Sequence, residues 1–154
     1  MTNFSANAMT YAFYLLALHP KFQDELYEEA QRVYGDKDPQ YEDISELVYS
    51  TCIIYETMRL FPFGSTISQI SYKDQKIQGK YPVPEGIAIA FDMVNTPRNE
   101  KYWGPNADEF DPLRFLDPNS DSPKFKSPDR GTWIAFGDGP RACLGYNIPL
   151  SSRI

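Results

Sequence analysis

Ten consecutive residues near the carboxyl end of the chain combine glycines, an arginine and a lone cysteine. They read Phe136-Gly137-Asp138-Gly139-Pro140-Arg141-Ala142-Cys143-Leu144-Gly145. Glycine permits backbone conformations that are closed to other residues, so such a loop can direct a cysteine side chain toward a bound group. A cysteine at the entrance to a helix receives backbone N–H donors and positive potential, which favour its thiolate. We expect such a helix to begin at Leu144.

The neighbouring positions have separate roles in this interpretation. Gly145 allows a flat macrocycle to approach the backbone, Phe136 packs beside the sulfur, and Arg141 pairs with an anionic propionate. A single cysteine in a glycine-rich turn is more often an ordinary small buried residue. The number of patterned positions around Cys143 favours the ligand interpretation instead.

The loop resembles the haem-binding signature of the cytochrome P-450 family, Phe-x-x-Gly-x-Arg-x-Cys-x-Gly, and matches it at every fixed position. The resemblance implies a haem cofactor, iron protoporphyrin IX, whose iron takes Cys143 as its axial ligand. It also implies a haem-dependent monooxygenase that inserts one oxygen atom from O2 into a small organic substrate. The implied cofactor-binding residues are Phe136, Gly137, Gly139, Arg141, Cys143 and Gly145.

Two further segments carry the same resemblance. Glu56-Thr57-Met58-Arg59 is similar to the family's Glu-x-x-Arg helix motif, and Asp111-Pro112-Leu113-Arg114-Phe115 is similar to its Pro-x-Arg-Phe segment. Glu and Arg three residues apart share a helix face, and an isolated pair of this kind is usually a surface salt bridge. Here the apolar neighbours predict burial, which requires further partners. The resemblance implies a buried structural cluster of Glu56, Arg59 and Arg114, with no part in bond chemistry.

Several positions differ from the family pattern, among them Asn3 and Phe4, which stand where an acidic residue and a threonine usually manage oxygen protonation. Gln69 stands where many members carry an arginine that contacts a haem propionate, and Pro97 stands where histidine is common. The resemblance therefore implies modestly weaker propionate and loop contacts in this chain.

Apolar residues recur at helical spacing in the first part of the chain, and after Pro62 the period changes to two. Pro20 and Gly35 mark the ends of the first two runs. A later stretch is rich in Asn, Pro and Asp and is expected to be a long ordered loop held by aromatic side chains (Tyr102, Trp103, Phe110, Phe115 and Trp133). The expected elements are helices at 6–18, 20–34 and 47–60, strands at 67–72, 76–78 and 87–91, and the loop at 95–135.

The predicted fold is mainly α with a small β-sheet, an α+β arrangement that the resemblance identifies as the C-terminal part of the cytochrome P-450 fold. Members of the family are several times longer, so the chain is expected to be a truncated, partial domain. Its predicted divisions are helices at 1–61, the small sheet at 62–94, the meander at 95–135, and the cysteine loop with the start of the next helix at 136–154.

Composition excludes several classes of partner. The net charge of −6, with 21 acidic against 15 basic residues, makes a nucleic-acid groove improbable. Two distant cysteines, Cys52 and Cys143, do not form a disulfide framework and suit a reducing compartment. A single histidine leaves a zinc site without ligands. No stretch reaches the roughly 18–20 apolar residues of a membrane span. The expected location is intracellular, with the full-length family at the endoplasmic reticulum membrane and this segment unanchored.

The sequence has no G-x-G-x-x-G fingerprint for a nicotinamide or flavin. Electrons are therefore expected from a separate reductase, an NADPH-dependent flavoprotein that docks on the cysteine side. Residues 121–154 carry five cations against three anions, which fits either a solvated mixed-charge loop or a docking face. Two functional hypotheses remain: a haem monooxygenase whose C-terminal part this is, or a non-catalytic truncated fragment that does not bind haem on its own.

Overall fold

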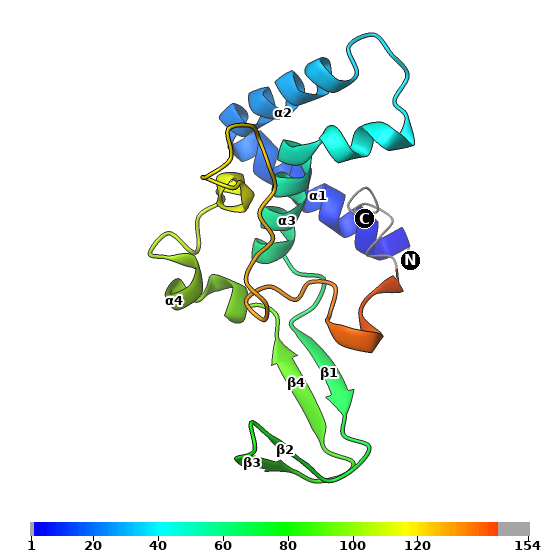
Figure 1. Cartoon of the computed structure of the whole chain (residues 1–154), viewed down its shortest axis with the longest axis vertical. Helices are drawn as coiled ribbons and strands as arrows, with labels where there is room; N and C mark the ends of the chain where they lie inside the picture. The colour runs from blue at the N-terminus through cyan, green and yellow to red at the C-terminus, as the bar shows by residue number, and fades with distance from the viewer. Residues whose placement is uncertain (1, 145–154) are drawn as a thin grey trace.

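A computed structural model describes residues 2–144 of the chain. Its first part contains α1 (Thr2–Leu18), α2 (Pro20–Val33) and α3 (Val48–Leu60), with a short 3-10 turn, η1 (Tyr41–Glu46), before α3. Helix α3 contacts both α1 and α2 and lies at the centre of the molecule (Figure 1). The three expected helices are all confirmed, and α1 begins four residues earlier than expected.

Local sequence explains where the helices end. Pro20 occupies the first turn of α2, where its missing N–H costs nothing and its fixed φ suits a helix. Gly35 follows α2 with a φ of +53°, and its N–H donates to the Gln31 carbonyl at 2.9 Å. A left-handed glycine in this position closes the helix, as the sequence predicts.

The strands form two separate antiparallel pairs, where the sequence predicted one small sheet. Strand β1 (Thr66–Ile70) pairs with β4 (Ala88–Asp92) in the register Gln69 to Ile89, and β2 (Gln75–Ile77) pairs with β3 (Tyr81–Val83). Both pairs project away from the helices in Figure 1. No strand is predicted at β3, because it is three residues long and contains Pro82. Gln78 and Gly79, with φ values of +53° and +67°, make the tight turn that precedes it.

The meander is an ordered segment with three short helical turns: η2 (Thr96–Arg98), α4 (Glu100–Trp103) and η3 (Pro112–Phe115). Phe110 and Phe115 are buried, and Trp103 and Trp133 pack against the core, as expected for a loop held by aromatic rings. Tyr102 differs from the expectation because its side chain is 52% exposed. A last short turn, η4 (Gly139–Arg141), lies in the cysteine loop.

Helix α3 supplies residues to both hydrophobic clusters of the molecule. The first cluster joins α1, α3 and the meander, and the second joins α3 to η3 and the segment that follows it. The helix is therefore the common support of the N-terminal helices and of the meander. The clusters consist of Leu15, Leu16, Tyr49, Ile53, Leu60 and Phe110, and of Cys52, Tyr55, Phe115 and Phe125.

None of the helices in residues 2–144 combines the length and the apolar character that a membrane crossing requires.

Candidate functional site

Glu56 and Arg59 face each other on α3 with no exposed side-chain surface. Their contact is bidentate: Arg59 Nε donates to Glu56 Oε2 at 2.6 Å and Arg59 Nη2 donates to Glu56 Oε1 at 2.7 Å. Paired donors in this fork are among the strongest hydrogen bonds in proteins. The two opposite charges therefore neutralise each other inside the protein, as their apolar sequence setting predicted.

The remaining Arg59 donors reach the backbone of the meander. Nη1 donates to the carbonyl oxygens of Pro97 at 2.7 Å and Ala107 at 2.5 Å, and Nη2 donates to that of Glu109 at 3.1 Å. The guanidinium also lies 5.0 Å from the ring centroid of Trp103. At Pro97 the contact uses a backbone carbonyl, which any residue at that position would supply.

Arg114 completes the group that the sequence predicted. Its Nε donates to Glu56 Oε1 at 3.3 Å, and its Nη1 donates to the Trp103 carbonyl and to Asn106 Oδ1, both at 3.0 Å. Its Nη2 donates to the Asn106 carbonyl. The backbone N–H of Asp111 adds a fourth donor to Glu56, at 2.9 Å from Oε1. The structure thus brings Glu56, Arg59 and Arg114 together, and their structural role remains a prediction.

Glu29 of α2 is a buried carboxylate, although the apolar spacing of α2 predicts it on the exposed face of the helix. It is 2% exposed, and it accepts hydrogen bonds from the Tyr49 N–H, the Ser50 N–H and the Ser50 hydroxyl, each at 2.7 Å. The first N–H groups of a helix have no partner within it, and the helix dipole favours an anion there. Glu29 therefore caps α3 from a neighbouring helix. The glutamates around it in sequence gave no signal that would distinguish it.

The cysteine loop is shaped by the two glycines that the sequence singled out. Gly137 and Gly139 have φ values of +73° and +71°, in the left-handed region that favours glycine. The Cys143 N–H donates to the Phe136 carbonyl at 2.8 Å and so closes the loop on itself. The Cys143 thiol is free and exposed. Leu144, where the next helix is expected to begin, is the last described residue, and Gly145 and the rest of that helix lie outside the described residues.

An exposed ion pair lies next to the η4 turn of the cysteine loop. Arg130 Nε donates to Asp138 Oδ2 at 2.9 Å, and the Gly139 N–H donates to Asp138 Oδ1 at 2.7 Å. The hydrogen bond from Arg130, followed by that from Gly139, holds the pKa of Asp138 below its ordinary value. Arg141, predicted to contact a propionate, is exposed on the adjoining turn.

Known proteins identify the family that this arrangement belongs to. The family model described as Cytochrome P450 matches residues 2–150. The chain belongs to the cytochrome P450 family. The chain is 34% identical to secologanin synthase 1 of Catharanthus roseus over 92% of its length, and 35% identical to probable cytochrome P450 313a4 of Drosophila melanogaster over 96%. It is 33% identical to the bifunctional cytochrome P450/NADPH–P450 reductase 2 of Bacillus subtilis (strain 168) over 95%.

The chain spans 26%, 30% and 13% of the lengths of these three relatives, respectively. The fold prediction is nevertheless confirmed over the described region, because helices combined with small antiparallel strand pairs are consistent with the α+β architecture of a P450. Membership of the family also implies a haem cofactor.

The residues present fit a haem that is held through one protein ligand. Cys143 is exposed, so a flat macrocycle can reach its sulfur, and the turns at Gly137 and Gly139 carry no side chain on that backbone. Within residues 2–144 no group of three or more His, Cys, Asp or Glu side chains is placed to hold a metal ion. A single thiolate suits an iron that brings its other ligands in a porphyrin.

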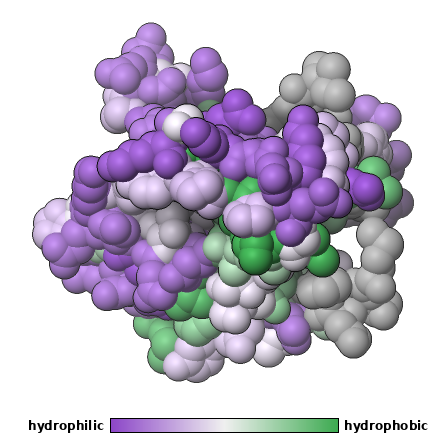
Figure 2. Space-filling model, turned by 90° about the horizontal axis from the view of Figure 1, so that it is seen from below, coloured by the Kyte–Doolittle hydropathy of each residue, from purple (hydrophilic) through white to green (hydrophobic). Residues whose placement is uncertain are grey.

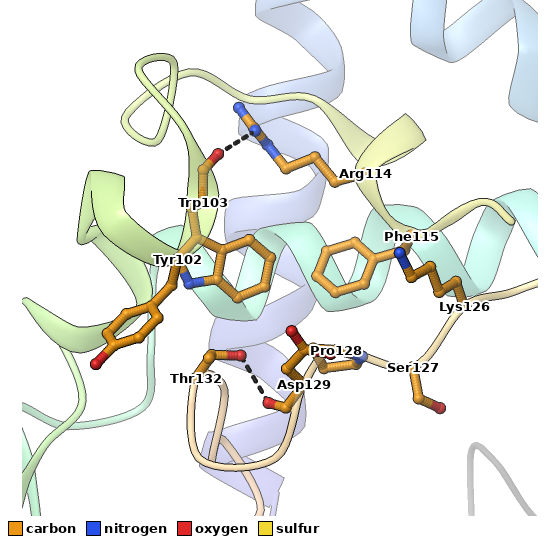
Figure 3. A pocket seen from close by; sticks show the side chains of 9 residues that line it. All are labelled: Tyr102, Trp103, Arg114, Phe115, Lys126, Ser127, Pro128, Asp129 and Thr132. Atoms are coloured by element: carbon orange, nitrogen blue, oxygen red, sulfur yellow. Dashed lines mark hydrogen bonds between the residues drawn. The ribbon is translucent and has the colours of Figure 1, made fainter. Parts of the chain in front are cut away.

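A separate cavity of about 250 Å³ lies within the meander, between residues 102–115 and residues 126–132 (Figure 3). The rings of Trp103 and Phe115 lie on one side of it, while Arg114 points away toward the Trp103 carbonyl. Thr132 closes the opposite side, where its hydroxyl donates to the Asp129 carbonyl at 2.7 Å. Among the described residues, none from Phe136 onward lines this cavity.

Proposed function

We propose that Cys143 is the axial thiolate ligand of a haem iron, and that the protein to which these residues belong is a monooxygenase. The observation that carries the proposal is the geometry of the cysteine loop. The loop contains two glycines in the left-handed region, and it is closed by the 2.8 Å hydrogen bond from the Cys143 N–H to the Phe136 carbonyl. The Cys143 thiol is exposed at the end of this closed loop. Thiolate-bound haem supplies the oxidising power that inserts one oxygen atom from O2 into an organic substrate.

The chain's own residues have distinct parts in this proposal. Cys143 holds the iron, Phe136 packs next to the sulfur, and Arg141, exposed on the next turn, pairs with a propionate. Gly145 gives the macrocycle close access to the backbone. The buried cluster holds the meander against α3 and thereby supports the cysteine loop that follows the meander. It consists of Glu56, Arg59 and Arg114.

We further propose that a flavoprotein reductase delivers the electrons on the cysteine-loop side. One relative carries an NADPH–P450 reductase in the same chain, according to its name. The exposed Lys126 and Arg130 precede the loop, and cationic side chains attract an acidic partner over about one Debye length. Salt should therefore weaken reduction of the P450 by such a partner.

A second candidate is a chain that does not bind haem by itself. The observation that favours it is the amount of large apolar surface open to solvent: Phe13 is 63% exposed, Ile70 71% and Tyr72 81%. Figure 2 shows apolar residues open to solvent beside polar ones on the face seen from below. Exposed apolar surface of this kind marks contact sites for other protein or for a ligand.

One experiment decides between the two candidates. The chain is reconstituted with haem, reduced and exposed to carbon monoxide, and the Soret band is recorded. The red-shifted band of thiolate-ligated iron is expected, and Cys143→Ser should abolish it. Cys52→Ser is the matched control, because Cys52 is fully buried in the second hydrophobic cluster. Absence of the band in the unmodified chain supports the second candidate, and a band that survives Cys143→Ser overturns the ligand assignment.

A further inference from the structure

Tyr55 is a buried aromatic residue of α3 that lies directly before Glu56. It is 3% exposed, and its ring stacks on that of Trp133 with centroids 4.4 Å apart and planes at 13°. Phe125 and Phe115 pack edge-on against the same ring, with centroids at 4.6 Å and 5.5 Å. Tyr55 is therefore fixed by rings from three later segments of the chain.

Trp133 is the residue through which this packing reaches the cysteine loop. Its ring makes an edge contact with Phe136, with centroids 5.8 Å apart at 65°. The Phe136 carbonyl accepts the hydrogen bond from the Cys143 N–H at 2.8 Å, and the Ile134 carbonyl accepts one from the Gly137 N–H at 2.8 Å. Two ring contacts and one hydrogen bond thus connect Tyr55 with the backbone of Cys143.

Ring packing holds the Trp133 side chain in place. Its indole N–H is buried and finds no acceptor within the described residues. A buried indole that lacks a hydrogen bond has its orientation set by the rings around it, and stacked aromatic pairs add a geometric preference to their burial. Of the ring contacts that Trp133 makes with Tyr55 and Phe136, the stack on Tyr55 has the shorter centroid distance, 4.4 Å against 5.8 Å to Phe136.

We propose that Tyr55 is a positioning residue for the Cys143 loop and acts through its stack on Trp133. Successive residues of an α-helix project about 100° apart. Tyr55 and Glu56 therefore lie on neighbouring faces of α3, and the Tyr55 ring reaches Phe136 of the cysteine loop only through Trp133. That this positioning serves iron ligation rests on the proposed function. The effect of Tyr55 on the order of the Cys143 loop does not depend on it.

The test compares amide hydrogen exchange, measured residue by residue, in the loop and in α3. Tyr55→Leu should raise the ratio of exchange rates between the Gly137 and Cys143 amides and the α3 amides by about tenfold, because it removes the stack that orders the loop. Tyr55→Phe keeps the ring and should restore the original ratio. A residue that only fills the core would change both sets of amides together.

Tyr49→Leu is the matched control on the same helix. Tyr49 is 8% exposed and belongs to the first hydrophobic cluster, on the side of α1. Its replacement should leave the ratio between loop and helix unchanged even where both rates rise. A change in the ratio equal to that of Tyr55→Leu would overturn the proposal.

Trp133→Leu removes the same stack from its other partner. It provides the test if the Tyr55→Leu variant does not fold. Trp133→Leu should raise the ratio of loop to α3 exchange rates to a similar extent. The double variant should show no larger ratio than the stronger single variant, since each single substitution already removes the same stack. Unchanged loop exchange in either folded single variant, or additive effects, would contradict the proposal. All rates are measured without haem, so failure to bind haem would count against the proposed function alone.

Discussion

The guanidinium of Arg59 joins α3 to the meander at three backbone carbonyls while it holds Glu56 in a bidentate pair. A lysine at this position would keep the positive charge but would lose the planar fork and two of the five donors. Removal of one partner from a buried ionic network leaves the others unpaired in a medium of low polarity.

We expect Arg59→Lys to lower the free energy of unfolding by about 3 kcal/mol, measured by urea denaturation. The control is Arg32→Lys, because Arg32 is 61% exposed and lies 3.7 Å from Glu29. Because the Arg32 side chain lies largely in solvent, its replacement by lysine should change stability by no more than about 0.5 kcal/mol. Equal effects of the two substitutions would show that the buried network does not support the fold as described.

Asp138 makes the cysteine loop sensitive to acid. Its pKa is lowered from an ordinary value of 3.8, chiefly by the hydrogen bond from Arg130. Because the folded pKa lies below the unfolded one, the stabilisation is complete above about pH 4. It is lost as the pH falls through the folded pKa. An NMR titration of the Asp138 carboxyl should show the lowered pKa, and Arg130→Gln should bring it back toward 3.8. A pKa that does not move in that variant would exclude the ion pair as its cause.

At the scale of elements, the N-terminus of α3 depends on a carboxylate that α2 provides. Glu29→Ala would leave the Tyr49 and Ser50 N–H groups without an acceptor, at a cost of about 1–3 kcal/mol for each buried donor. We expect Glu29→Ala to lower the urea midpoint clearly and Glu29→Gln to lower it less, since the amide oxygen still accepts one bond. Glu28→Gln is the matched control on the exposed face of α2 and should have no measurable effect. Loss of stability at Glu28 equal to that at Glu29 would contradict the capping role.

Local patterns predicted the helices well, because their apolar spacing and their Pro and Gly boundaries act within a few residues. The same holds for the spacing of Glu56 and Arg59 and for the two loop glycines. Glu29 and Tyr55 were out of reach for the opposite reason, since their partners lie about 20 and 80 residues away in sequence. Their side chains look like those of any helical glutamate and any buried tyrosine until the fold brings the partners together.

At the scale of the whole molecule, the β1–β4 pair exposes apolar side chains as well as two strand edges. Ile70 at the end of β1 is 71% exposed, and Ile87, the residue directly before β4, is 50% exposed. Unpaired edges with apolar side chains are templates for association between chains. We expect the chain to self-associate at rising concentration, and the double change of Ile70 and Ile87 to Thr to reduce this in sedimentation velocity. Lys76→Thr, on the exposed β2 strand, should have no such effect. Identical association of the double variant and the unmodified chain would locate the contact elsewhere.

The two cysteines differ completely in access: Cys52 has no exposed surface, whereas the Cys143 thiol is open to solvent. A maleimide dye added to the native chain should therefore label one position only, without any engineered cysteine. The label would sit on the loop assigned to the iron, and its fluorescence would report directly on the order of that loop. Haem and dye would also compete for the same sulfur. The decrease in Cys143 labelling on addition of haem would therefore measure haem binding without catalytic turnover.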